Sequence, residues 1–267
     1  MPSSGLRWVS ALVAVLAGAP AASAEPRLEP GRIEEMELMA LPEGPEAPTP
    51  GDLEALRARL REVVGKNRAP GAAVALVGPR GELLIEGFGR AGAGRPMDAD
   101  ALFRVGSITK SFISLAVMRL VQLGKLRLDD RVLTLAPELG VKNPYERTHP
   151  LQVTHLLEHT SGFDEMRFNE IFDGPDGDDR PLREVLAVNP RSRVSRWEPG
   201  TRFSYSQPGY TTAAYLVEKV SGMPYARFLE EEVFRPLGIQ ASVRLTDEAR
   251  RHLAEGHDRG RLQPYLH

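Results

Sequence analysis

The sequence contains no cysteine, few lysines and no excess of positive charge. Without cysteine, disulfide bonds, thiolate metal sites and cysteine nucleophiles are excluded. The 34 basic and 36 acidic residues give a net charge of -2. A protein that binds nucleic acid mainly through its charge is therefore excluded too. Only five of the basic residues are lysines. A lysine is of interest here because it can exchange a proton near neutral pH, whereas arginine cannot.

Long hydrophobic runs are also scarce, and the clearest one lies at the N-terminus. It covers the twelve residues Trp8–Ala19 and is followed by Ala22-Ser23-Ala24, the small-residue pattern of a signal-peptidase site. The run is short for a membrane span. We therefore expect residues 1–24 to be a secretory signal peptide, with a retained membrane anchor as the alternative. The mature protein would be periplasmic or secreted and would have no membrane span.

The rest of the chain divides into a linker and a domain. Residues 25–50 contain six prolines and are expected to form a linker. Residues 51–267 are expected to form one domain, since a chain with 42% hydrophobic and 26% charged residues has the composition of a folded protein.

Hydrophobic spacing predicts the main elements of this domain. Two short runs separated by a glycine-proline turn predict a β-hairpin, at 72–77 and 83–88. No clear strand is predicted after residue 90, and neither a strand nor a helix after Pro236. Helices are predicted at 53–64 (capped by Asp52), 107–123 (buried), 153–159, 210–220 and 225–234.

Ser107 and Lys110 form a Ser-x-x-Lys pattern at the predicted start of a helix. Side chains three residues apart lie on the same face of a helix, so the amine would reach the hydroxyl. The helix N-terminus favours negative charge on the serine oxygen. Ser107 would then be a nucleophile that needs no histidine. The alternative is a serine helix cap followed by a solvated lysine.

Two other patterns could indicate metal ions. His155, Glu158 and His159 match His-x-x-Glu-His, in which two histidines one helical turn apart bind zinc. A third ligand would be needed, and the cluster 230–232 is the available candidate. We expect structural histidines instead. The acidic segment 173–179 lacks EF-hand spacing and is expected to be a solvated loop. No metal site is therefore predicted.

Six segments follow one another over about 170 residues: 70–75, 102–112, 153–162, 199–210, 220–225 and 234–238. In this order they resemble serine hydrolases related to class C β-lactamases and D-alanyl-D-alanine peptidases. The resemblance implies an α+β fold of the β-lactamase/transpeptidase type. In this fold an antiparallel sheet is flanked by helices, a helical lobe is added, and the site lies between them.

The resemblance also implies residue roles. Ser107 would be acylated, Lys110 would accept its proton, and Tyr205 would be the tyrosine of a Tyr-x-Asn motif that relays protons. Without the family, Tyr205 would be interpreted as a core aromatic. Gln207 stands where asparagine is usual and is expected to bind substrate. Its side chain is one methylene longer, so its amide would be displaced by about 1 Å from that of asparagine, and a positioning error of this size can lower the rate roughly a hundredfold. The substrates implied are a peptidoglycan peptide, a β-lactam or an ester, with no cofactor.

Relatives of this kind carry a third motif, Lys or His followed by Thr or Ser and then Gly. No such triplet follows Pro236. We therefore expect the domain to be incomplete at its C-terminus, with the C-terminal strands missing. This leaves a second functional hypothesis, a non-catalytic cell-wall-binding module or a degenerate hydrolase.

Overall fold

The structure is a computed structural model that describes residues 48–67, 69–78, 81–165, 181–244, 246–258 and 261–263. The expected signal peptide, most of the expected linker and the acidic segment 173–179 lie outside the described residues. Within the described ranges, no helix is long and apolar enough to cross a membrane.

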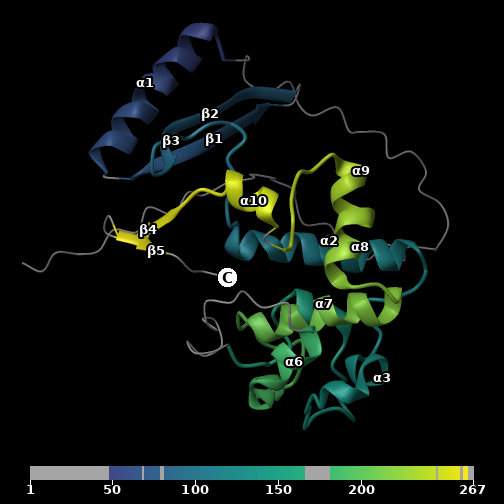
Figure 1. Cartoon of the computed structure of the whole chain (residues 1–267). Coiled ribbons are helices and arrows are strands. Elements are labelled where there is room, and N and C mark those ends of the chain that lie inside the picture. Colours follow the sequence, from purple (N-terminus) through teal and green to yellow (C-terminus); the bar gives the residue numbers. More distant parts are fainter. Residues whose placement is uncertain are drawn as a thin grey trace, which may run out of the picture. The chain divides into compact units, whose positions relative to one another are not determined.

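The predicted hairpin is present, as the first two strands of an antiparallel sheet with the order β1-β2-β3 (Figure 1). The strands are β1 (Gly71–Gly78), β2 (Gly81–Gly92) and β3 (Arg95–Pro96). A Cβ atom at Gly87 would lie 2.3 Å from the carbonyl oxygen of Met97, so glycine lets the segment after β3 approach β2 closely. The sequence did not predict β3, because two residues are too few to show alternation.

Helix α1 (Pro50–Lys66) packs against β2 and begins earlier than predicted. Asp52 does not cap it. Thr49 is the N-cap, and its Oγ1 accepts the backbone N–H of Asp52, the third helical residue. The Asp52 carboxylate accepts the backbone N–H of Thr49 in turn, which completes a capping box. An ion pair of 2.7 Å between Arg57 and Glu86 links the helix to β2. The cap prediction was wrong because threonine and aspartate are both good caps and the sequence does not show which one is used.

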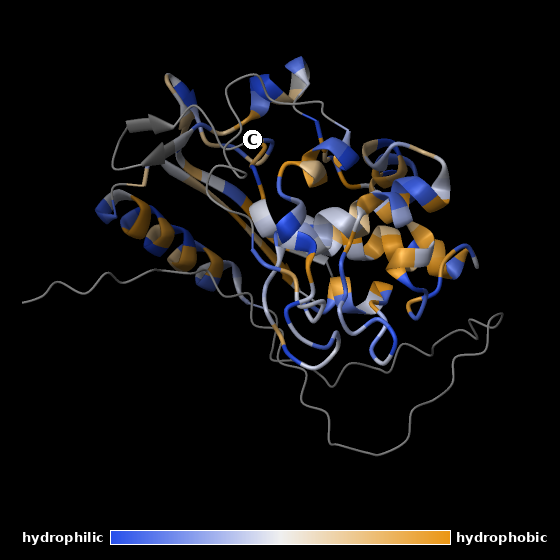
Figure 2. Ribbon diagram, turned by 90° about the horizontal axis from the view of Figure 1, so that it is seen from below, coloured by the Kyte–Doolittle hydropathy of each residue, from blue (hydrophilic) through white to orange (hydrophobic). Residues whose placement is uncertain are grey.

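Most of the other helices form a lobe that contains the hydrophobic core cluster (Figure 2). Pro236 lies inside a continuous helical stretch from Tyr225 to Leu237, in which Glu230–Phe234 form a π-helical turn. The helices are α2 (Thr109–Gln122), α3 (Val132–Leu135), α4 (Val153–Leu157), α6 (Leu182–Ala187), α7 (Gln207–Ser221), α8 (Tyr225–Leu229) and α9 (Arg235–Leu237).

Helix α2 is buried along one face only, which corrects the prediction of a buried helix. Ile113, Val117 and Leu120 lie in the core and pack toward α7. On another face Leu115 and Met118 are each 45% exposed. The sequence of this helix did not distinguish the two faces, because almost all residues on both faces are uncharged.

Three elements follow Pro236 that the sequence did not predict: α10 (Asp247–His252), β4 (Gly256–Asp258) and β5 (Arg261–Gln263). The expectation of no strand or helix in this part was therefore wrong, because elements of three to six residues are too short to show periodicity. The chain next to α10 also contacts an earlier segment. Leu102 donates to the carbonyl of His252 over 2.9 Å and accepts from Ala254 over 2.8 Å. The α+β architecture itself is confirmed.

Candidate active site

Ser107 lies in a 3₁₀ turn, Gly106–Ile108, that leads directly into α2. Gly106 has a φ of 52°, a left-handed conformation that favours glycine, and it lies where the chain turns into the helix. Lys110 follows in the first turn of α2, and its Nζ donates to Ser107 Oγ over 3.3 Å. The predicted Ser-x-x-Lys pair is therefore formed.

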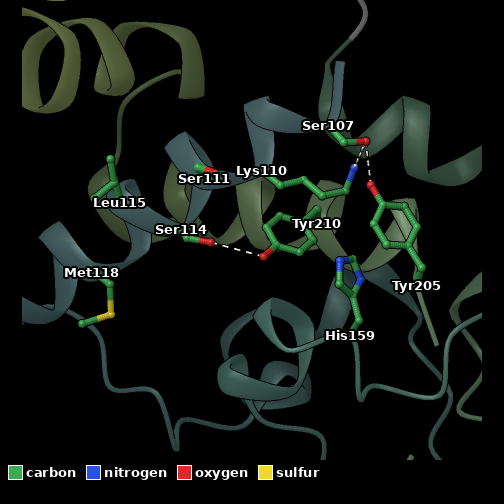
Figure 3. A pocket seen from close by; sticks show the side chains of 9 residues that line it. All are labelled: Ser107, Lys110, Ser111, Ser114, Leu115, Met118, His159, Tyr205 and Tyr210. Carbon is green, nitrogen blue, oxygen red and sulfur yellow. Dashed lines mark hydrogen bonds between the residues drawn. The ribbon is translucent and has the colours of Figure 1, made fainter. Parts of the chain in front are cut away.

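Tyr205 joins this pair from a segment 98 residues away. Its hydroxyl donates to Ser107 Oγ over 2.6 Å, and the Lys110 ammonium lies 4.7 Å from the centre of its ring (Figure 3). Ser107 Oγ thus accepts hydrogen bonds from two groups. Two donors on one oxygen stabilise negative charge that develops there.

Tyr205 is held in place because helix α7 begins immediately after it. Ser206 is the N-cap, and its Oγ accepts from the Gly209 N–H over 3.1 Å. The same Oγ donates to the carbonyl of Asp164 over 3.1 Å. Pro208, with its fixed φ, sits in the first turn, where its missing N–H costs nothing. The start of the helix thereby fixes the position of the phenol.

Gln207 is the predicted site residue that the structure does not bring to the others. It is the first residue of α7, and its backbone N–H donates to Glu165 over 3.1 Å. Its side chain is not among those that line the pocket at Ser107. Its role as a substrate ligand stays a prediction.

The pocket at Ser107 is open and has a volume of about 580 Å³, in the range of small-molecule sites. Most of its lining comes from one face of α2, at spacings of three and four residues from Ser107. Sequence reasoning missed six lining residues, although this helical spacing would have identified those in α2. The lining residues are Ser107, Lys110, Ser111, Ser114, Leu115, Met118, His159, Tyr205 and Tyr210 (Figure 3).

The two histidines of the His-x-x-Glu-His pattern do not share a helix face. Helix α4 ends at Leu157, and His159 has a φ of 58°, which turns the chain out of the helix. In each histidine Nδ1 accepts a backbone N–H, from Gln152 for His155 and from Ser206 for His159. Burial lowers the pKa of both. The geometry required by the zinc pattern is absent, and among the described residues no three potential ligands cluster.

The chain is similar to proteins of known name. The esterase EstB of Burkholderia gladioli is 34% identical over 232 residues, which cover 80% of this chain and 57% of the esterase. Penicillin-binding protein 4 of Amycolatopsis lactamdurans is 34% identical over 188 residues, 70% of this chain and 48% of that protein. This chain thus spans about half the length of these relatives.

Solved structures show the same fold. An octameric penicillin-binding protein homologue from Pyrococcus abyssi superposes with a TM-score of 0.68 at 30% identity, covering 80% of this chain and 51% of that one. EstCE1, a hydrolase with promiscuous acyltransferase activity, gives a TM-score of 0.66 at 26% identity, covering 80% and 58%. Residues 56–266 match the Beta-lactamase family. The chain has the β-lactamase/transpeptidase-like fold and belongs to the Beta-lactamase family.

Proposed function

We propose that this protein is an exported serine hydrolase that forms an acyl-enzyme at Ser107. The observation that carries the proposal is the pair of hydrogen bonds to Ser107 Oγ, from Tyr205 over 2.6 Å and Lys110 over 3.3 Å, at the edge of an open pocket. The relatives named as an esterase and as a penicillin-binding protein support it. Export rests on the signal-peptide pattern of residues 1–24.

In the proposed reaction the Lys110–Tyr205 pair has first given up one proton to solvent. Ser107 Oγ then bonds to the carbonyl carbon of the substrate as its own proton passes to this pair. That pair then protonates the leaving group as the bond to the carbonyl carbon breaks, and an acyl-serine ester remains. Water attacks this ester, gives a proton to the same pair, and releases the acid while Ser107 regains its hydrogen. The substrate is a carbonyl compound of the ester, β-lactam or peptide class.

Intact-mass spectrometry tests the proposal. After incubation with a fluorophosphonate or a penicillin, we expect one adduct on the wild-type protein and none on Ser107→Ala. Ser242→Ala is the matched control, because Ser242 is an exposed serine in a loop and should leave the adduct unchanged. If the wild type forms no adduct, or Ser107→Ala forms as much as the wild type, the proposal fails. Saturable binding of peptidoglycan fragments without turnover would favour the binding-module hypothesis.

A further inference from the structure

His159 holds the segment that carries Tyr205 by three separate contacts. Its carbonyl accepts the backbone N–H of Ser204 over 2.8 Å, and its Nδ1 accepts the N–H of Ser206 over 3.0 Å. Its ring stacks on the Tyr205 ring, with 4.3 Å between centroids and 27° between planes. Both neighbours of Tyr205 and the phenol itself therefore contact one residue.

The backbone of His159 is strained. Its φ of 58° makes it the single non-glycine residue with a positive φ in the part of the chain that the structure describes. A side chain in this conformation is disfavoured, and such strain persists where surrounding contacts determine it. Glycine would relieve the strain but would supply neither the stacked ring nor the Nδ1 acceptor. The conformation turns both the carbonyl and the ring of His159 toward Ser204–Ser206.

The contact with Ser206 also fixes the charge state of the ring. An imidazole nitrogen that accepts a backbone N–H carries no proton, so in the neutral ring the hydrogen is on Nε2. Protonation would place a hydrogen on Nδ1 and break this bond. The surroundings oppose protonation, since burial and the nearby Lys110 ammonium lower the pKa of His159, while Glu165 acts weakly in the other direction.

The groups that face the ring come from three elements. Lys110 belongs to α2 and Glu165 to the segment after α4, while Tyr205 lies just before α7 and Tyr210 in its first turn. The Tyr210 ring lies 5.0 Å from that of His159. The ring of His159 therefore contacts Tyr205 and lies close enough to Lys110 for the ammonium charge to act on it. Tyr205 and Lys110 are the two side chains that form hydrogen bonds to Ser107.

We propose that His159 is a positioning residue of the active site, which orients the Tyr205 hydroxyl toward Ser107 only while its own ring is neutral. This inference rests on the proposed function. It assigns to His159 the control of the proton relay at acid pH. Activity should fall as His159 gains a proton, through a lower kcat rather than a higher KM, because the phenol moves while the rest of the pocket stays.

Two substitutions separate the roles of the ring. His159→Asn keeps an acceptor at the Nδ1 position, does not titrate, and places at a positive φ a residue that tolerates it. Because it loses the stacked ring, we expect it to lower Ser107-dependent ester hydrolysis at every pH, but to flatten the acid side of the kcat profile. His159→Phe keeps a stacking ring without an acceptor, and should lower kcat by about ten- to a hundredfold at every pH.

His155→Asn is the matched control. His155 also accepts a backbone N–H through Nδ1, over 3.2 Å, and burial also lowers its pKa, but it has no contact with Tyr205 among the interactions of the described residues. It should reproduce the wild-type profile of kcat against pH. If His159→Asn shows the same acid side as the wild type, or if His155→Asn alters it equally, the positioning role is refuted.

Nuclear magnetic resonance gives a readout that does not depend on activity. In protein labelled at histidine and tyrosine, His159 should show the Nε2–H form and titrate below the ordinary value of 6.5, and the Tyr205 ring signals should shift with it. Tyr205→Phe identifies those signals. If the Tyr205 signals shift with the titration of His159 while no hydrolysis occurs, the proposed function fails and the positioning role of His159 stands. If they are independent of His159, the positioning fails even where hydrolysis is found.

Discussion

The sharpest test of the active site is removal of one oxygen atom, by Tyr205→Phe. The phenol oxygen is 2.6 Å from Ser107 Oγ, whereas the ring is held separately by its stacking on His159. Phenylalanine keeps the stacked ring and loses only the donor. If Tyr205 transfers protons, the rate of acylation should fall roughly a hundredfold to ten-thousandfold, the usual contribution of a general acid–base group.

The same substitution should have little effect on stability. Tyr205 is 39% exposed, so water can replace the lost hydrogen bond, and we expect the free energy of unfolding to fall by less than about 1 kcal/mol. Tyr215→Phe is the complementary control. Its partly buried hydroxyl donates to Glu138 over 2.7 Å, at another point of α7. That variant should lose about 1 kcal/mol, or roughly 2–4 °C in Tm, and keep the acylation rate.

Two assays on each variant decide the question. The second-order rate of fluorophosphonate labelling, followed by intact mass, reports acylation, and thermal unfolding reports stability. A labelling rate of Tyr205→Phe within about threefold of the wild-type rate would refute a proton-transfer role. Loss of a general acid–base group lowers the rate far more than that. A large loss of Tm in Tyr205→Phe would instead show that its hydroxyl supports the fold.

Two further predictions concern stability. Arg193 is buried and donates to the carbonyls of Leu139 (2.9 Å) and Leu186. Arg193→Met should therefore lower the free energy of unfolding, measured by urea denaturation, by about 3 kcal/mol. Arg191→Met, at an exposed position in the same turn, should change it little. Burial lowers the pKa of His155 and His159 below 6.5, so the unfolded chain binds more protons near that pH, and the urea midpoint should be higher at about pH 7.5 than at about pH 5.5. The double variant His155→Asn/His159→Asn should lose most of this difference in urea midpoint. If it keeps the whole difference, the assignment is contradicted.

The parts of the site that lie close together in sequence were predictable from residue spacing. Ser107 and Lys110 are separated by one helical turn, so the spacing alone placed the amine beside the hydroxyl. Tyr205 is 98 residues away, and only the resemblance to known hydrolases indicated its role. The hairpin and the long helices were also predicted, because their hydrophobic patterns extend over enough residues to show a period.

The missed features have a common physical cause, since each depends on contacts that a local pattern does not contain. The strand β3 has two residues, which pair with Arg90 and Gly92 of β2, and β4 and β5 have three residues each. The substrate-binding role expected for Gln207 comes from the motif in which asparagine is usual, and it stays a prediction. The position of Gln207 at the start of α7 follows from the N-cap Ser206.

The backbone conformation of His159 is the clearest feature that residue spacing does not determine. Spacing placed it four residues after His155, where an uninterrupted helix would have aligned the two for a metal ion. A single left-handed residue ends that alignment and turns the ring toward Tyr205 instead. The strain of that conformation is offset only if the contacts with Ser204–Ser206 form, and those contacts lie in a segment more than forty residues away. The position of the phenol at Ser107 and the strained turn at His159 therefore depend on each other, so a substitution that releases one should displace the other.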